Sequence, residues 1–501
     1  MKIEQTAVGR AQLASFLDQN WGAEHWPDHR LTAAGIAFIP LGEDSYCYSC
    51  HPTIGAEQAA TKQPLGFFAR LEPADGGDLD VVVRRLDAVG HVCALLGAGA
   101  DSADAELTSA VVAPLTLAQA GSSFAKALSP GFAVTMFPLL AGSQVMPADD
   151  DGSWVPDIPD RIRAAEIIGT LHRRSVLQDR SVLLAAERLG TEDFGHTHRQ
   201  GIESALRYAA ECTKHGFGGT CSAAEQECCA LLIESRAGIQ WLLEELDELQ
   251  RSLLLATNKR SYVLTHQEPH LANFCAVHTS ETSSRQLCLI DWGGLLLGPP
   301  ERDLFALLGD PRPEGVREAV VQAYLSSRFS NADNSMADDI LVRPEVMRWY
   351  ELRWVAQEVD DYATRIFEIR QGQGGGSAAC TREQIRCLDE LKDYLPVDTK
   401  TMMQGTSECG LQATNAALEW CKLNMPSDRD DDQWRPVKDI FNCILMVTVI
   451  LPPALLIYHL RYWCTISKFQ LDSATDSEAG WNLVLHLMSR PLELLQANDV
   501  I

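Results

Sequence analysis

The order of strand-like and helix-like segments constrains the fold of this chain more than any other feature. Short runs rich in aromatic and β-branched residues, separated by turn residues, predict strands over 37–39, 45–50, 65–71 and 132–140. One helix, 78–88, is predicted among them. From residue 159 onward apolar residues recur at helical spacing, over 162–172, 225–254, 301–308, 314–326, 343–368 and about 380–394. This order predicts a bilobal α+β fold, with a small β-rich lobe, a larger helical lobe and a cleft between them.

Two short apolar runs interrupt the helical part and predict strands. They cover 262–266 and 286–291, with polar residues between them, and together they predict a hairpin. We therefore divide the chain into three parts: an N-terminal lobe over 1–139, a helical lobe with this hairpin over 140–397, and a C-terminal extension over 398–501.

The extension contains an uncharged stretch. Residues 440–458 are 19 positions without a charge, and a helix of that length spans roughly 28 Å, barely the thickness of the hydrocarbon core of a bilayer. Pro452 and Pro453 lie inside it, and an interior proline costs a helix about 3 kcal/mol. The pattern favours a buried segment, and a membrane anchor is the alternative.

Charge and cysteine usage narrow the partners and the compartment. The chain has 501 residues, with 42 Lys and Arg against 68 Asp and Glu, for a net charge of −26. A phosphate backbone requires clustered Lys and Arg, so this balance argues against nucleic-acid binding and suits a cationic or metal-bound ligand better. The 15 cysteines are too few for a disulfide-rich scaffold, and the first residues lack a signal-peptide pattern. Both observations predict a cytoplasmic protein.

The polar residues of the predicted hairpin have the spacing of a phosphoryl-transfer site. Glu268 follows His266 by two residues and precedes Asn273 by five, as in kinase catalytic loops, and Asp291 follows the next apolar strand. In such sites one carboxylate orients the attacking hydroxyl, while a second carboxylate and an amide oxygen hold Mg²⁺ on the phosphates. The spacing therefore predicts phosphoryl transfer.

Several ordered motifs resemble the aminoglycoside phosphotransferase and choline kinase family. Residues 262–274 are similar to its catalytic loop, and 290–304, which include Ile-Asp-Trp, are similar to the metal strand of its spectinomycin phosphotransferase branch. Segments that resemble the inter-lobe linker, a Gly-x-Leu-His helix and a late helix of the family are 132–142, 167–173 and 352–362. The resemblance extends from about residue 31 to 394. It implies a protein-kinase-like fold, bound ATP and Mg²⁺, and a small-molecule hydroxyl acceptor.

The resemblance implies a role for each residue of the predicted site. Asn273 and Asp291 would ligate Mg²⁺, Glu268 would orient or deprotonate the acceptor hydroxyl, and His266 would brace the loop. Glu268 stands where the family has Asp, and moving a carboxylate by about 1 Å can cost ~10²-fold in rate. The alternative for all four residues is a hairpin with ordinary polar turn residues.

On the nucleotide side, the resemblance places Arg70 where the family has a lysine that holds the α- and β-phosphates. Arginine keeps the charge but has a planar fork in place of a compact ammonium. The nearest candidate for the acidic helix partner of this cation is Asp80. The loop 41–46 resembles a phosphate turn, although a plain hairpin turn is the alternative. The nucleotide contacts implied by this turn and the linker are Gly42, Ser45, Met136 and Pro138.

Trp354, Glu358 and Asp361 follow one another at i, i+4 and i+7 of a predicted helix. Carboxylates and an aromatic ring on one face would attract a cationic acceptor, and the alternative is a solvated acidic face with Trp354 in the core. We hypothesise a kinase that transfers the γ-phosphoryl group of ATP to a hydroxyl of an amine-bearing metabolite or antibiotic. The rival hypothesis, favoured by Glu268 and Arg70, is a pseudokinase that acts by binding a partner.

Overall fold

The computed structural model describes fourteen segments of the chain, which are 7–39, 45–53, 66–74, 77–98, 105–118, 123–140, 143–145, 157–216, 221–256, 261–278, 285–308, 316–329, 343–371 and 378–397. All of them lie in one compact unit, Met1–Leu423. Gly42 and the uncharged stretch 440–458 lie outside the described residues. Among the helices of the described segments, none is both long enough and apolar enough to cross a membrane.

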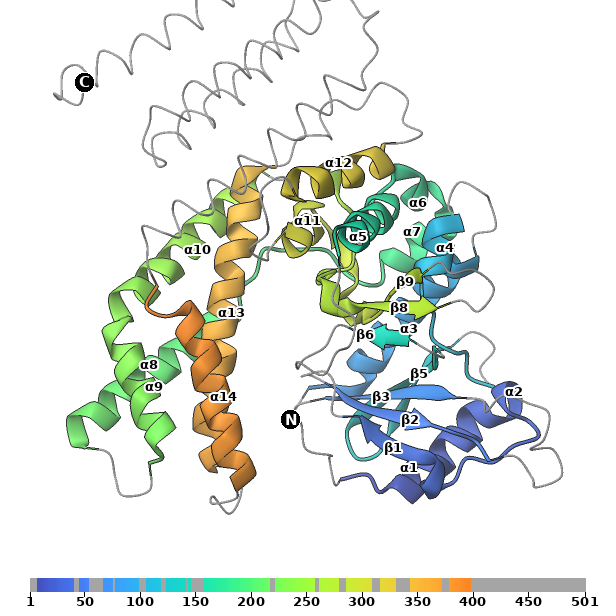
Figure 1. The fold of residues 1–501 in the computed structure, drawn as a ribbon, viewed down its shortest axis with the longest axis horizontal. Helices are drawn as coiled ribbons and strands as arrows, with labels where there is room; N and C mark the ends of the chain where they lie inside the picture. The colour runs from blue at the N-terminus through green and yellow to red at the C-terminus, as the bar shows by residue number, and fades with distance from the viewer. Residues whose placement is uncertain are drawn as a thin grey trace, which may run out of the picture. The chain divides into compact units, whose positions relative to one another are not determined.

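The N-terminal lobe is built on a five-stranded antiparallel sheet (Figure 1). In spatial order its strands are β1 (Ile36–Ile39), β2 (Tyr46–Cys50), β3 (Phe67–Pro73), β5 (Phe132–Pro138) and β4 (Ala125–Leu128). An apolar core with the nearly fully buried Trp21, Trp26 and Tyr48 joins the sheet to helix α1 (Arg10–Leu17) and to the residues on either side of the short helix α2 (Ala23–His25). Helix α3 (Leu79–Ala98) packs against β4 and β5, and α4 (Ala105–Ala110) follows it. The predicted strands and helix are confirmed.

The rest of the described chain is mostly helical. Its helices are α5 (Ile158–Leu171), α6 (Arg174–Gln178), α7 (Arg180–Ala186), α8 (His198–His215), α9 (Ala223–Glu234), α10 (Arg236–Ala256), α11 (Glu301–Leu308), α12 (Val316–Arg328), α13 (Pro344–Gln371) and α14 (Ala378–Tyr394). Helix α5 begins at a capping box in which Asp157 and Asp160 each accept a hydrogen bond from the other's backbone N–H. It packs against α12, while α13 packs against α8, α10 and α14 (Figure 1).

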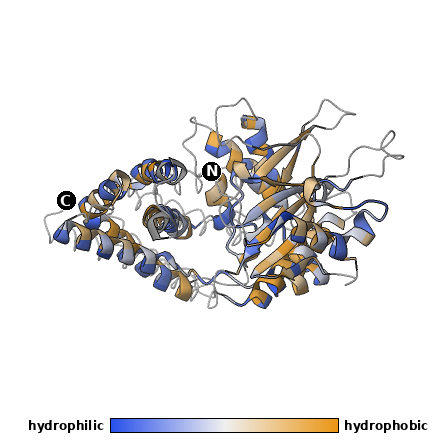
Figure 2. Ribbon diagram, turned by 90° about the horizontal axis from the view of Figure 1, so that it is seen from below, coloured by the Kyte–Doolittle hydropathy of each residue, from blue (hydrophilic) through white to orange (hydrophobic). Residues whose placement is uncertain are grey.

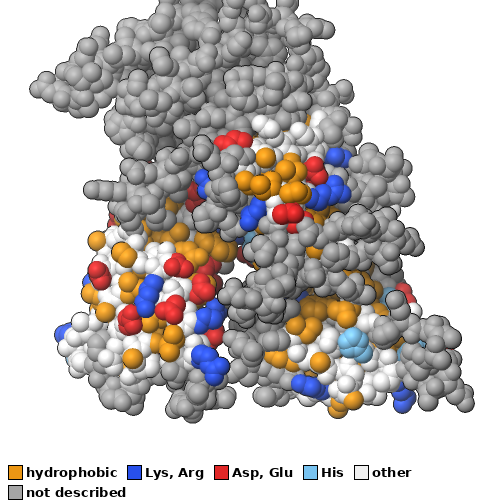
Figure 3. Space-filling model, in the orientation of Figure 1, with side chains coloured by type: hydrophobic (Ala, Val, Ile, Leu, Met, Phe, Trp, Pro, Cys, Tyr) orange, Lys and Arg blue, Asp and Glu red, His pale blue; other side chains and the backbone are white. Residues whose placement is uncertain are grey.

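The helices around α13 share one apolar core. Trp349 and Tyr350 of α13 are fully buried there, and the ring of Phe194 meets Trp349 edge to face at 5.2 Å. Figure 2 shows that these helices carry hydrophobic and hydrophilic residues in alternation, as amphipathic helices do. Where Figure 3 colours the described side chains, acidic and basic side chains are interspersed.

The single helix predicted over 225–254 is wrong, because the structure has two helices, α9 and α10, separated at Ser235. Leu232 and Ile239 on either side of the break are both fully buried in the same core. The apolar spacing therefore continues across Ser235, and periodicity alone does not reveal the turn.

The predicted pairing of 262–266 with 286–291 is also wrong. Strand β7 (Val263–Thr265) pairs with β10 (Leu296–Gly298), and β9 (Arg285–Leu289) pairs with β8 (Phe274–His278), beside which β6 (Ser143–Val145) lies. β8 begins directly after the catalytic-loop motif, where a short strand is hard to distinguish from the loop that leads into it. The true hairpin, β8–β9, has Asn273 before its first strand and Asp291 just after its second.

Candidate active site

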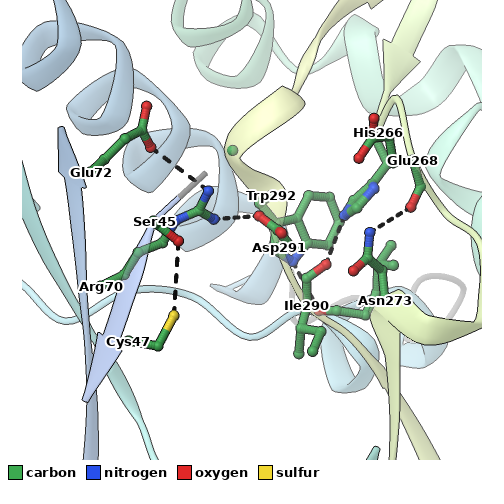
Figure 4. Close-up of polar contacts among 12 residues, drawn as sticks. Ser45, Cys47, Arg70, Glu72, His266, Glu268, Asn273, Ile290, Asp291 and Trp292 are labelled. Carbon is green, nitrogen blue, oxygen red and sulfur yellow. Dashed lines mark hydrogen bonds and ion pairs between the residues drawn. The ribbon is translucent and has the colours of Figure 1, made fainter. Parts of the chain in front are cut away.

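Arg70 on β3 reaches from the N-terminal sheet to the end of the β8–β9 hairpin. One guanidinium nitrogen donates a hydrogen bond to Oδ1 of Asp291, and another lies 3.7 Å from Oε2 of Glu72 (Figure 4). Burial alone would raise the pKa of the Asp291 carboxyl, but the charge and hydrogen bond of Arg70 outweigh it and hold that pKa below its usual value. Both groups are therefore charged at neutral pH.

The partners of Arg70 correct one prediction. The carboxylates next to its guanidinium are Asp291 and Glu72, whereas Asp80 makes no contact with it, and the Asp80 backbone N–H bonds to Asp78. Glu72 lies two residues along β3, on the same face of the strand as Arg70. The acid beside Arg70 on the N-terminal side thus comes from its own strand rather than from the helix.

Asp291 has an unusual backbone conformation. Its φ of 61° places it in the left-handed region, which costs a non-glycine residue about 1–2 kcal/mol. The residue stands between the end of β9 and the turn Trp292–Gly294, and its carboxylate points toward Arg70 (Figure 4). Backbone strain of this kind concentrates at functional sites, where the surrounding structure maintains it.

Asp303 of α11 binds the backbone of the loop that carries Glu268. The backbone N–H groups of His266 and Gln267 donate to the two carboxylate oxygens of Asp303 at 2.7 and 2.8 Å. Asp303 is fully buried, so these bonds compete little with water. Gln267 has a φ of 83°, and the two bonds stabilise this left-handed turn at the residue before Glu268.

Asp303 is itself the end of a buried chain of hydrogen bonds. Nε2 of His172 lies 3.0 Å from its Oδ2, Nδ1 of His172 lies 2.8 Å from the Tyr324 hydroxyl, and Arg328 donates to that hydroxyl at 3.1 Å. Burial lowers the pKa of His172. Because a carboxylate only accepts, the neutral ring donates from Nε2 and accepts from Tyr324 at Nδ1. Asp303 and His172 lie inside two of the family-like motifs, yet our sequence analysis gave neither a role.

His266 lies where a bracing residue is expected. Its ring is fully buried, its Nε2 lies 2.9 Å from the carbonyl oxygen of Ile290, and the ring meets Trp292 edge to face at 4.9 Å. Burial lowers the pKa of this imidazole, so the ring is neutral and Nε2 donates to Ile290. The bond joins the catalytic-loop motif to the residue just before Asp291.

Asn273 contacts the backbone of Glu268 (Figure 4). The Asn273 side-chain nitrogen donates to the backbone oxygen of Glu268 at 2.8 Å, which leaves its amide oxygen without a hydrogen bond among the described residues. The backbone oxygen of Asn273 accepts from Ile290 N–H at 2.9 Å, so Asn273 and Asp291 belong to the same end of one hairpin. The Glu268 side chain is 43% exposed and lies 3.8 Å from a guanidinium nitrogen of Arg302.

The residues expected at the nucleotide differ in position. Ser45 is buried just before β2, with its hydroxyl 3.8 Å from the Cys47 sulfur, and Cys47 pairs in register with Arg70. Pro138, the last residue of β5, is partly buried. Met136 does not reach the site, because its side chain is fully buried in the sheet core and its carbonyl oxygen accepts from Leu115 N–H at 2.7 Å. Gly42 is outside the described residues.

The residues expected at the acceptor do not form one face at Glu268. Glu358 is buried, and its charge raises the pKa of Tyr394 on α14 after the larger effect of burial. Asp361 has a carboxylate oxygen near Asp360 and His198 of α8, and Trp354 is half-buried. On α13, the charge of Glu268 interacts instead with Arg353. Burial, and next the charge of Arg302, lower the pKa of the Arg353 guanidinium.

Comparison with known proteins agrees with this geometry. Residues 164–338 match the phosphotransferase enzyme family. The chain carries a phosphotransferase domain. It is 25% identical over 411 residues to Protein StrN of Streptomyces griseus, covering 79% of this chain and 97% of StrN.

Among solved structures, the chain is similar to spectinomycin phosphotransferase in complex with ADP and spectinomycin. The TM-score is 0.50 at 14% identity, covering 80% of this chain and 98% of that one. This likeness shows a shared fold and confirms the bilobal, kinase-like arrangement. The match over residues 164–338 supports a phosphotransferase.

Proposed function

We propose that this phosphotransferase uses Mg²⁺ and ATP to phosphorylate a hydroxyl of a small, amine-bearing metabolite or an aminoglycoside-like antibiotic. The observation that carries the proposal is the convergence of one loop and one hairpin. Asp303 holds the loop of Glu268 by two backbone N–H groups, and the β8–β9 hairpin brings Asn273 and Asp291 to the same end, opposite Arg70. The solved relative with ADP and spectinomycin supports a nucleotide and a small acceptor.

The donor atoms at the hairpin fit magnesium. The Asn273 amide oxygen has no partner among the described residues and the Asp291 carboxylate is charged. Hard oxygen ligands of this kind suit Mg²⁺, which takes only one or two protein groups. When bound, the ion would neutralise charge on the phosphates. Arg70 would hold phosphate oxygens with its planar, permanently charged fork.

Glu268 is the group placed to act on the acceptor hydroxyl. It accepts the proton or orders the hydroxyl for attack, which typically contributes 10²–10⁴-fold. Arg302 restrains the side chain at 3.8 Å, and this contact limits the extra freedom of a glutamate compared with an aspartate. Asp303 and His172 act indirectly: Asp303 binds the backbone N–H groups of the two residues before Glu268, and His172 bonds to Asp303.

One observation favours a second candidate, a pseudokinase that binds a partner. The carboxylate expected to ligate the metal is already engaged by Arg70, and a metal ion must compete with that cation. Such a protein would bind nucleotide weakly or without turnover. The two candidates therefore differ in whether the protein turns over ATP.

The deciding experiment measures Mg²⁺-dependent ATP turnover over a panel of amino sugars and amino alcohols, with Asp291→Ala as the control. Turnover with at least one acceptor that is lost in Asp291→Ala supports the kinase. Nucleotide binding by thermal shift without turnover on any acceptor supports the pseudokinase, because a ligand that binds only the folded state raises its melting temperature.

A further inference from the structure

Helix α3 contributes a basic side chain, Arg85, to the site, where the family resemblance led us to expect an acidic one. Nη2 of Arg85 donates to Oε1 of Glu72 on β3, and Nη1 donates to the backbone oxygen of Gly293 at 3.0 Å. One side chain thus joins three pieces of the structure: the helix, the central strand and the turn that follows Asp291. A lysine could not make both bonds in the same way, because it lacks the planar fork.

Glu72 is shared between two arginines. Its Oε1 accepts from Arg85, and its Oε2 lies 3.7 Å from Nη2 of Arg70. Its side chain is only 12% exposed, so a charge there requires compensation. Since Arg70 in turn bonds to Asp291, the four side chains alternate in sign from the helix to the hairpin: Arg85, Glu72, Arg70 and Asp291.

Gly293 shows how closely this network approaches the turn after Asp291. A Cβ atom at this position would lie 3.2 and 3.3 Å from the two terminal nitrogens of Arg70. The guanidinium therefore lies against the Gly293 backbone, while Arg85 binds the carbonyl oxygen of the same residue. Arg85 thus bonds to the backbone that follows the left-handed Asp291, and Arg70 lies beside it and bonds to the Asp291 side chain.

We propose that Arg85 is a positioning residue of the nucleotide and metal site, acting through Glu72 and Gly293. It reverses the polarity of the strand–helix ion pair expected for the family. By engaging Glu72 and the Gly293 carbonyl, it leaves Arg70 directed at the hairpin and keeps Asp291 in its strained conformation. Without Arg85, Glu72 keeps a single cationic neighbour, and Arg70 is drawn away from the hairpin toward Glu72. This inference rests on the proposed nucleotide site.

The test compares nucleotide affinity in Arg85→Ala, Arg85→Lys and the matched control Arg84→Ala, by calorimetry with Mg²⁺ and a non-hydrolysable ATP analogue. Arg84 is the exposed neighbour of Arg85 and makes no hydrogen bond or ion pair within the described part of the chain. We expect Kd to rise about tenfold or more in Arg85→Ala, from the loss of charge-assisted bonds. Arg85→Lys should fall between, and Arg84→Ala should stay within about twofold of wild type.

Glu72→Gln supplies a second route to the same answer. If Arg85 acts through Glu72, the double variant Arg85→Ala/Glu72→Gln loses less affinity than the product of the two single losses, which is the signature of a coupled pair. Melting temperatures of all variants are measured alongside. Should Arg85→Ala not fold, Arg85→Lys and Glu72→Gln carry the comparison.

The outcomes separate this inference from the proposed function. If wild type binds the nucleotide and Arg85→Ala binds it equally well, Arg85 has no positioning role, although the nucleotide site stands. Equal losses in Arg85→Ala and Arg84→Ala, or strictly multiplicative losses in the double variant, would also overturn it. A wild-type protein that binds no Mg²⁺–nucleotide removes the proposed function and this inference together.

Discussion

The guanidinium of Arg70 donates a hydrogen bond to the carboxylate of Asp291 across 221 residues of sequence. The contact joins the central strand of the N-terminal sheet to the hairpin of the helical lobe, at the place where phosphates and metal would lie. Each group stabilises the charge of the other, since Asp291 and Glu72 favour the protonated form of Arg70 against the effect of burial. The site is thus neutralised internally, and a metal–nucleotide complex must replace that neutralisation.

The identity of the cation at residue 70 should matter less than its charge. Arg70→Lys is expected to retain ATP turnover within about tenfold, because an ammonium still offers a positive charge to phosphates. Arg70→Met should lose about 10² or more in kcat/KM for ATP, since two carboxylates then face each other without their cation. Steady-state kinetics with varied ATP checks both. Equal values in Arg70→Met and wild type would show that Arg70 does not bind the nucleotide.

The length of the residue-268 side chain gives a second prediction. If its carboxylate orients the acceptor hydroxyl, Glu268→Asp should preserve or raise kcat, because it restores the family's shorter acid. Glu268→Gln should lower kcat by about 10²–10⁴-fold, the usual contribution of a general base. Steady-state kinetics with varied acceptor concentration at saturating ATP measure kcat for each variant. Three equal rates would remove this carboxylate from the mechanism.

The buried carboxylate of Asp303 should be critical for stability. Asp303→Asn turns an amide N–H₂ toward a backbone N–H group that Asp303 now satisfies, and it removes the negative charge that faces His172. Removing one member of a buried pair typically costs about 3–5 kcal/mol. The free energy of unfolding from urea titration measures the loss.

A matched control is available for that experiment. Asp247 also contacts a histidine and an arginine, His196 and Arg199, but its side chain is 45% exposed. Asp247→Asn should therefore cost at most about 1 kcal/mol. A similar loss in both variants would mean that the burial of Asp303 is not what makes its bonds valuable.

Glu351 on α13 predicts a pH dependence of stability. Burial raises the pKa of its carboxyl to about 8, against the opposing charges of Arg348 and Arg317, and its Oε2 has no hydrogen-bond partner among the described residues. Between the unfolded value near 4.5 and 8, the folded state binds more protons than the unfolded state. Its contribution to stability is therefore complete at low pH and is lost as the pH rises through this window.

Replacing Glu351 by Gln removes that dependence. The variant should match wild type near pH 4.5 and be more stable by about 1–2 kcal/mol at pH 8.5, because it carries no charge to bury. Chemical denaturation at the two pH values gives the comparison. A gain that is equal at both values would point to packing rather than ionisation.

Much of the fold follows from local patterns. Alternating and apolar runs in the first third predict four of the five strands of the N-terminal sheet, all but β4, and the longer helices α3, α5 and α11 to α14 follow from 3.6-residue spacing. The predictions fail where one sequence pattern is compatible with two different local structures. The apolar spacing of 225–254 continues through the break at Ser235. The strand β8 was missed because it begins at the last residue of the catalytic-loop motif.

Partners across the fold could not be read from the chain. Asp80 was the nearest candidate for an acidic partner on the helix, but Arg70 meets Glu72 and Asp291, and α3 contributes Arg85. Spacing placed Trp354, Glu358 and Asp361 together, whereas packing buries Glu358 near α14 and leaves Asp361 near His198. Helical spacing gives the side of a helix, and the neighbouring elements decide what that side meets.

By itself, the sequence determined the chemical groups and their order: an acid at 268, an amide at 273 and an acid at 291, separated as phosphoryl transfer requires. It also indicated many of the segments that form strands and helices, because those preferences are local. Only the tertiary structure decided that Arg70 neutralises Asp291, that Asp303 holds the loop of Glu268, and that Arg85 replaces the expected acid. These are contacts between charges far apart in the chain, and their energies depend on distances and burial that only the packed fold creates.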